Sequence, residues 1–162
     1  MVHTSIRKIV VAIDFGDESA EILQVAAELG CGLGAEVHLV HVYDPKPLQV
    51  YDVGIYPVMM PGETVAEHEA VLKEEREQLR GQSTFLREAG VKTFAYMKPI
   101  DKSVSKSILH FASSYNGDLI LLGTSRPNRI EEMLIGSVAK KVLRKSQIPV
   151  LLIPRIRSEP QT

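Results

Sequence analysis

The residues best suited to chemistry lie near the C-terminus, where a glycine ends one apolar run and a Gly-Ser pair precedes a basic segment. Leu119–Leu122 stops at Gly123, and Gly136-Ser137 follows thirteen residues later, at the expected start of a helix. The backbone N–H groups at a helix start favour phosphate, and the helix macrodipole adds about half a positive charge there. The spacing therefore predicts an anion-binding cradle, although it is not a known catalytic motif.

A second candidate follows the first apolar run of the chain. Lys8–Ile13 is β-branched and unbroken, which is typical of a buried parallel strand, and Asp14 comes directly after it. The Asp14 carboxylate could accept hydrogen bonds from a ribose or an adenine amino group, or help to hold a metal ion. It could equally serve as a turn residue or helix N-cap. A ligand that contacts both Asp14 and Gly123 requires their strands to be neighbours in the sheet.

Two common nucleotide-binding motifs are missing. No G-x-G-x-x-G follows the first strand and no G-x-x-x-x-G-K-[ST] occurs, so NAD-type and P-loop binding are disfavoured. His3, His38, His68 and His110 show no metal-ligand spacing. We interpret His41, on the second expected strand, as a hydrogen-bonded histidine near the core.

Strands alternate with helices along the chain, which predicts a single-domain α/β fold with helices on both faces of a parallel sheet. We favour the strand order 3-2-1-4-5 in this three-layer sandwich, while the flavodoxin-like order stays open. A helix that begins at Ser19 is expected to end at the glycines between 30 and 34. The other expected elements are strands at 8–13, 37–42, 91–97, 119–122 and 150–153, and helices at 63–89 and 103–115 and after Gly136.

Composition narrows the class of protein. The 162 residues fit one domain, 1–162, with a core at 6–154 and a polar tail at 155–162. A formal charge of −1 gives no basic surface for nucleic acid. One cysteine excludes an intramolecular disulfide, and we interpret Cys31 as a small core residue. No apolar run is long enough for a signal peptide or membrane span, so a cytoplasmic protein is expected.

The segment 45–62 is an apolar insert loop with four prolines. The simplest interpretation is a surface loop that folds back on the body of the protein. The alternatives are a lid over a ligand site or a surface that binds a partner.

From KIVVAID through LVHVYD to LLG…GSVAKKVLRKSQIPVLLI, residues 6 to 154 resemble the universal stress proteins. The resemblance implies five parallel strands in an adenine nucleotide alpha hydrolase-like fold, a cytoplasmic location and a homodimer formed through the last strand, Val150 to Ile153. The charge balance and the short apolar runs predict no contact with nucleic acid or membrane. The ATP-binding branch of the family carries G-x2-G-x9-G-[ST], which falls here on Gly123, Arg126, Gly136 and Ser137, with arginine at the middle glycine.

By the same resemblance, Ala12 and Asp14 would contact the adenosine, Val42 the base, and the residues from Gly136 to Ala139 the phosphates. The implied ligand is ATP, ADP or AMP, with Mg²⁺ as a possible companion. The full set of implied nucleotide-binding residues is Ala12, Asp14, Val42, Gly123, Thr124, Arg126, Gly136, Ser137, Val138 and Ala139.

Arginine at the middle position changes the expected loop. A left-handed arginine costs about 1–2 kcal/mol, and Pro127 pushes the residue before it towards extended backbone. The Arg126 guanidinium either grips phosphate with charge-assisted hydrogen bonds or fills the pocket, for instance by pairing with Asp14 or Glu131. Such a loop would suit AMP or ADP better than ATP.

The leading hypothesis is a stress-response regulatory protein that binds an adenine nucleotide as a homodimer and has no dedicated catalytic residues. One alternative is a slow ATPase or phosphoryl-transfer enzyme that uses the same pocket. The other is a dimeric protein-interaction module that binds no nucleotide.

Overall fold

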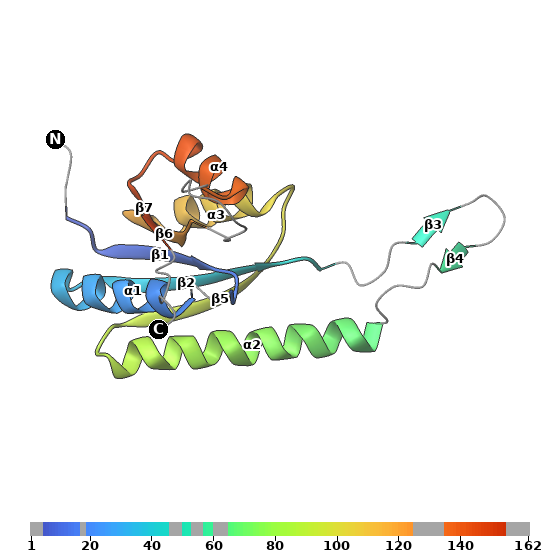
Figure 1. Ribbon diagram of the computed structural model, residues 1–162, viewed down its shortest axis with the longest axis horizontal. Coiled ribbons are helices and arrows are strands. Elements are labelled where there is room, and N and C mark those ends of the chain that lie inside the picture. Colours follow the sequence, from blue (N-terminus) through green and yellow to red (C-terminus); the bar gives the residue numbers. More distant parts are fainter. Residues whose placement is uncertain are drawn as a thin grey trace, which may run out of the picture.

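Five parallel strands form one sheet at the centre of the protein (Figure 1). The computed structural model describes residues 5–16, 19–45, 50–52, 57–59, 65–124 and 135–154. In sheet order the strands are β5 (Thr93–Pro99), β2 (Glu36–Tyr43), β1 (Lys8–Ile13), β6 (Leu119–Gly123) and β7 (Val150–Ile153). Counted along the chain, this is the predicted order 3-2-1-4-5, and the flavodoxin-like order is wrong.

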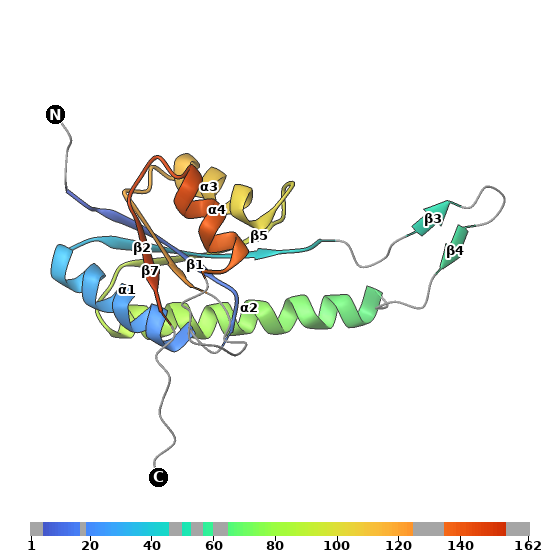
Figure 2. The ribbon, with the colours of Figure 1, turned by 45° about the horizontal axis from the view of Figure 1, so that its top comes forward.

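Helices cover both faces of the sheet, as Figures 1 and 2 show. One face packs against α1 (Ser19–Leu33) and α2 (Val65–Glu88), and the other against α3 (Val104–Ser114) and α4 (Ser137–Lys145). Parallel strands are joined by right-handed crossovers. The connections from β1 to β2 and from β6 to β7 run in opposite directions across the sheet, so their helices must lie on opposite faces.

The central strand carries apolar side chains on both faces, as expected for a parallel sheet between two helical layers. Ile9, Val10 and Val11 are fully buried. Ile9 and Val11 pack into the cluster beneath α1 and α2, whereas Val10 and Ala12 pack into the cluster beneath α3 and α4.

Helix ends follow local backbone chemistry at most of the predicted positions. Gly90, with a φ of 88°, ends α2, and Ser103 caps α3 by accepting a hydrogen bond from the Lys106 amide. The first helix ends within the predicted group of glycines: α1 passes through Gly30 and Gly32, ends at Leu33 and is followed by Gly34, which has a φ of 63°. A Cβ at position 30 would lie 2.7 Å from Val91 Cγ1, so that glycine serves packing and not termination.

The apolar stripe of α2 packs along only part of its length. Leu79 and Leu86 are buried, Leu72 is partly buried and Val65 is exposed. Figure 1 shows why, since the N-terminal part of α2 extends past the sheet. No helix within the described ranges is long and apolar enough to cross a bilayer.

The single cysteine does not lie in the core, and the expectation for it is wrong. Cys31 is exposed near the end of α1, and its Sγ donates to the Ala89 carbonyl at 3.1 Å.

Part of the 45–62 segment forms a small antiparallel pair, β3 (Val50–Asp52) and β4 (Pro57–Met59), which the sequence did not predict. The pair lies beyond the N-terminal end of α2 and apart from the five-stranded sheet (Figures 1 and 2). The remaining residues of this segment are outside the described ranges, so a role as a lid or partner surface stays a prediction.

Candidate functional site

A cavity opens where β1 and β6 separate at their carboxyl ends. Their pairing stops at Val11 and Leu121, whereas β1 stays paired with β2 as far as Ile13 and His41. After this point the chain leaves β1 towards α1 on one face and leaves β6 towards α4 on the other. Such a divergence in a parallel sheet leaves a crevice beyond the strand ends, which is the usual ligand site of open α/β folds.

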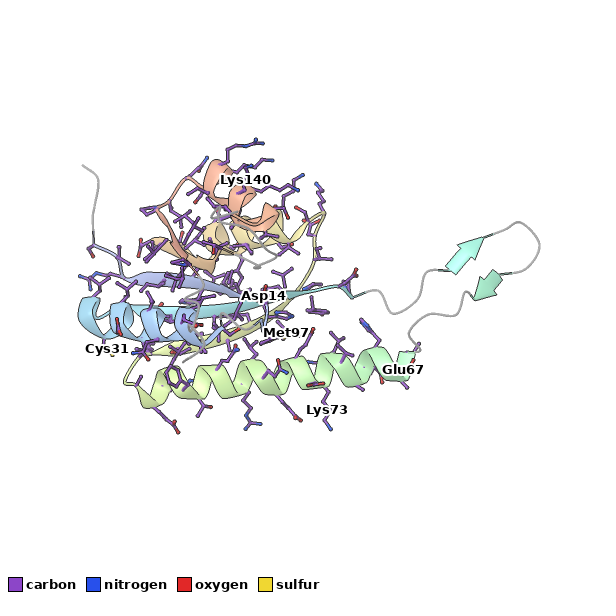
Figure 3. All side chains as sticks on the ribbon, in the orientation of Figure 1. Asp14, Cys31, Glu67, Lys73, Met97 and Lys140 are labelled. Atoms are coloured by element: carbon purple, nitrogen blue, oxygen red, sulfur yellow. The ribbon has the colours of Figure 1, made fainter. Side chains whose placement is uncertain are left out.

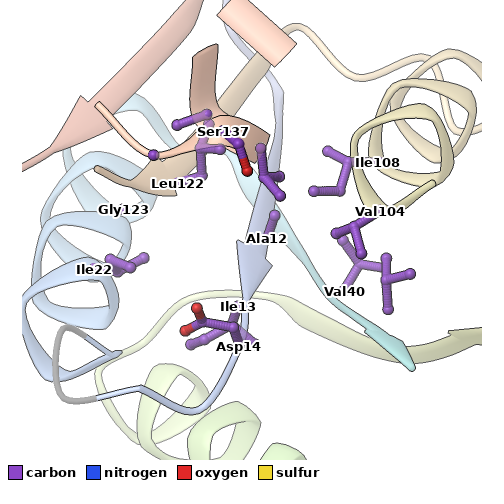
Figure 4. A pocket seen from close by; sticks show the side chains of 14 residues that line it. Ala12, Ile13, Asp14, Ile22, Val40, Val104, Ile108, Leu122, Gly123 and Ser137 are labelled. Atoms are coloured by element: carbon purple, nitrogen blue, oxygen red, sulfur yellow. The ribbon is translucent and has the colours of Figure 1, made fainter. Parts of the chain in front are cut away.

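The cavity has a volume of about 600 Å³, within the usual range for a small-molecule site. Ser137 and Asp14 lie on either side of Ala12, and Ile22 approaches from α1 (Figure 4). The described lining is Ala12, Ile13, Asp14, Ile22, Val40, Val42, Val104, Ile108, Leu122, Gly123, Gly136, Ser137, Val138 and Ala139.

Asp14 is held by a tight turn at the end of β1. Its Oδ1 accepts a hydrogen bond from the Gly16 N–H at 3.0 Å, and a Cβ at position 16 would lie 3.1 Å from that oxygen. Phe15, between them, has a φ of 59°, a left-handed conformation that few non-glycine residues adopt. The carboxylate therefore acts as a turn residue and lines the cavity at the same time.

The start of α4 presents backbone donors to the other side of the cavity. Gly136 is the N-cap residue, but it has no side chain that could accept a hydrogen bond from the first turn of the helix. Its own N–H donates to the Thr124 carbonyl at 2.6 Å. The first bond of the helix runs from the Lys140 N–H to the Gly136 carbonyl at 2.9 Å. By helix geometry, the amides from Ser137 to Ala139 therefore have no acceptor within the helix.

Between these polar ends the walls are apolar. Val40 and Val42 contribute from β2, and Val104 and Ile108, one helical turn apart, contribute from α3 (Figure 4). Among the described lining residues, Asp14 is the one ionisable side chain. The cavity thus combines a carboxylate, an apolar middle and a helix start that favours anions.

The model of the "Universal stress protein family" matches residues 5–154, nearly the whole chain. The chain belongs to the universal stress protein family. Universal stress protein MJ0531 of Methanocaldococcus jannaschii is 32% identical over 154 residues, which cover 94% of this chain and 85% of that protein.

Solved structures of universal stress proteins share the fold. A family member from Burkholderia pseudomallei aligns with a TM-score of 0.71 and 24% identity, covering 94% of this chain and 98% of that one. A universal stress protein from Archaeoglobus fulgidus, in complex with dAMP, aligns with a TM-score of 0.64 and 23% identity, covering 92% and 98%. At these identities, the likeness concerns the architecture.

Most of the residues implied by the universal stress protein resemblance meet in the cavity. The eight that line it are Ala12, Asp14, Val42, Gly123, Gly136, Ser137, Val138 and Ala139. Thr124 is not a lining residue, because its backbone joins the sheet to the start of α4: its N–H donates to Ile153 and its carbonyl accepts from Gly136. Arg126, together with Pro127 and Glu131, lies outside the described residues.

Six apolar lining residues were not predicted from the sequence: Ile13, Ile22, Val40, Val104, Ile108 and Leu122. Val104 and Ile108 belong to no motif, and only their spacing of four on a helix that follows an edge strand hints at a shared face. Ile22 and Leu122 read as ordinary core residues, which they also are. These residues shape the cavity without polar chemistry, so no motif reveals them.

Among the described residues, no group of three or more His, Cys, Asp or Glu side chains could hold a metal ion. The basic residues of α4, from Lys140 to Lys145, are exposed, and Lys140 is labelled in Figure 3.

Proposed function

We propose that this universal stress protein binds an adenine nucleotide in the cavity between β1 and β6, and acts as a homodimeric regulator. The observation that carries the proposal is that Asp14, at the end of β1, and the amides of Ser137 to Ala139, which have no acceptor within α4, line one cavity with apolar walls. A mononucleotide carries groups that match these features: hydroxyl donors on the ribose, a base with apolar faces and an anionic phosphate end.

Each part of the cavity has a distinct role in this proposal. The Asp14 carboxylate accepts from the ribose hydroxyls or the adenine amino group, since an ionised carboxylate only accepts. The wall formed by Val42, Val104 and their neighbours packs against the base. The α4 start and the Ser137 hydroxyl bind phosphate. The universal stress protein of Archaeoglobus fulgidus that was solved with dAMP supports the ligand class.

The proposal includes no catalytic step on the nucleotide. Asp14 is the one ionisable group of the described lining, and it lies across Ala12 from Ser137 (Figure 4). Binding that stabilises one conformation more than another is sufficient for regulation, because a ligand shifts only equilibria in which it discriminates between states.

Calorimetric titration with AMP, ADP and ATP, each with and without Mg²⁺, tests the proposal. We expect saturable binding and a rise in Tm, since a ligand at 100 times its Kd stabilises the folded state by about 2.7 kcal/mol. The absence of both at millimolar nucleotide would refute adenine-nucleotide binding and favour the nucleotide-free interaction module. Chromatography of the nucleotide after incubation would detect hydrolysis and so favour the enzyme.

Two substitutions locate the site. Asp14→Ala should weaken AMP binding about 10–100-fold, because it removes a hydrogen-bond acceptor that carries a full charge. Ser137→Ala should cost only a few-fold, because its backbone N–H remains. The exposed Glu88 on α2 and Ser113 on α3 supply matched controls, and Glu88→Ala and Ser113→Ala should leave the affinity unchanged.

Dimerisation through the last strand is the second part of the proposal. β7 ends the sheet, and its other edge offers backbone groups to a further strand. Leu151 on that strand is 38% exposed, which is high for a leucine in a sheet. Pairing with a second copy would cover both the edge and this side chain.

A further inference from the structure

His41 lies behind the proposed nucleotide site, on the opposite face of the sheet from Val40 and Val42. It sits on β2 in direct register with Ile13, the last residue of β1. Its side chain is 8% exposed. Neither the motif of the universal stress proteins nor the cavity lining includes this residue.

His41 contacts the residues on both sides of Asp14, which are Ile13 and Phe15. The ring Nδ1 lies 2.9 Å from the Ile13 carbonyl oxygen. A carbonyl only accepts hydrogen bonds, so Nδ1 carries a proton and donates. The ring also packs against Phe15, with centroids 4.3 Å apart and the planes inclined by 35°.

The second ring nitrogen points to helix α2. Nε2 lies 3.4 Å from Glu75 Oε2, and the two side chains are 8% and 26% exposed. Neither atom has a hydrogen-bond partner among the described residues, and both are shielded from solvent. The contact is an ion pair when both ring nitrogens carry a proton, because the imidazolium charge then faces the carboxylate.

We infer that His41 is a positioning residue for the nucleotide site, which fixes the turn that carries Asp14 and ties this turn to α2 through Glu75. Phe15 adopts a left-handed backbone that persists only where the surroundings enforce it, and the His41 ring is one such constraint. A turn held in place before the ligand arrives costs less to order on binding. This inference rests on the proposed function.

Replacement by the two side-chain amides separates the two ring contacts. In His41→Asn the amide nitrogen takes the place of Nδ1 and keeps the bond to Ile13, whereas in His41→Gln the amide reaches towards Glu75 and gives up that bond. We expect His41→Gln to weaken AMP binding about tenfold and His41→Asn to weaken it less than about threefold. Glu75→Gln, a change at a partly exposed position that leaves the fold intact, should weaken binding by about threefold.

Amide NMR signals of the free protein give a readout that needs no ligand. His41→Gln should shift or broaden the signals of Asp14 to Gly16, and His41→Asn should leave them near their original positions. The control is Leu79→Ala, a buried change on α2 that should lower stability in urea without altering these signals or the affinity for AMP.

Two results would overturn the inference. One is unchanged turn signals in His41→Gln. The other is a loss of AMP affinity that follows stability equally in the His41 variants and in Leu79→Ala, which is the behaviour of an ordinary core histidine. If the original protein binds no AMP, the proposed function fails, while the signals of the free protein still decide whether His41 positions the turn.

Discussion

Replacing Glu36 with glutamine should lower the stability of the protein at neutral pH and have little effect in acid. Glu36 begins β2, and its carboxylate contacts His38 Nε2 at 3.0 Å, Lys92 Nζ at 2.9 Å and Lys8 Nζ at 3.7 Å. Hydrogen bonds from His38 and then Lys92 lower the pKa of Glu36 from 4.5 to about 2, against a smaller opposing effect of burial.

The shift sets both the size and the pH range of the effect. A lowering of this size corresponds to at most about 3 kcal/mol, at 1.36 kcal/mol per pH unit. Lys92 is 70% exposed, and His38 carries a full charge only when protonated, so solvent screening reduces the net contribution to about 1.5 kcal/mol. Between about pH 4.5 and 2 the unfolded chain binds a proton that the folded protein does not. The contribution is therefore complete above pH 4.5, falls with the pH and is lost below 2.

Urea unfolding of the original protein and of Glu36→Gln, at pH 7 and again below pH 2, measures this difference. We expect the variant to be less stable by about 1.5 kcal/mol at pH 7, a drop in Tm of about 3–6 °C, and equal to the original in acid. Glu77→Gln, on the exposed side of α2, should show no difference at either pH. An equal loss at both pH values would mean that glutamine disturbs packing and that the charge has no role.

Three further substitutions test packing, capping and assembly. Gly30→Ala should lower the free energy of unfolding by about 1–3 kcal/mol, because the new methyl group meets Val91. Gly32→Ala is the control, since a methyl group there enters open space and should leave the free energy of unfolding equal or higher. Equal stabilities of the two variants in urea would contradict this expectation. Ser103→Ala should cost about 1 kcal/mol through the lost cap of α3, measured by thermal unfolding, and no loss would show that the cap is replaced. Leu151→Lys should convert the proposed dimer into a monomer in light scattering, and an unchanged mass would exclude β7 as the interface.

The strand order could be predicted because the candidate residues constrain it. Asp14 and Gly123 follow the first and fourth strands, and a ligand that contacts both requires adjacent strands. The structure has β1 next to β6, as this argument demands. The argument works because carboxyl ends of parallel strands share one edge of the sheet, so a chemical hypothesis about two residues becomes a statement about topology.

Long-range packing is what the sequence hides. Gly30 and Gly34 look alike in the chain, yet one has a close neighbour in Val91 and the other a left-handed backbone. The prediction that Cys31 lies in the core was wrong for the same reason. Helical spacing shows which residues share a face of the helix, but it does not show which face packs against the rest of the protein. His41 was correctly interpreted as hydrogen-bonded, but its hydrogen-bond partner Ile13 and its ionic contact Glu75 are both far away in the chain.

The cavity and its support arise from one feature of the sheet, the unequal pairing of β1 with its two neighbours. On the β6 side pairing stops at Val11, so Ala12 and Asp14 are free to line a cavity. On the β2 side it continues to Ile13, which brings His41 beside the last carbonyl of β1. A strand that lost its pairing on both sides at once would leave Asp14 on an unsupported loop. Because only one side opens, the carboxylate that faces the cavity directly follows a strand that is still paired at its last residue.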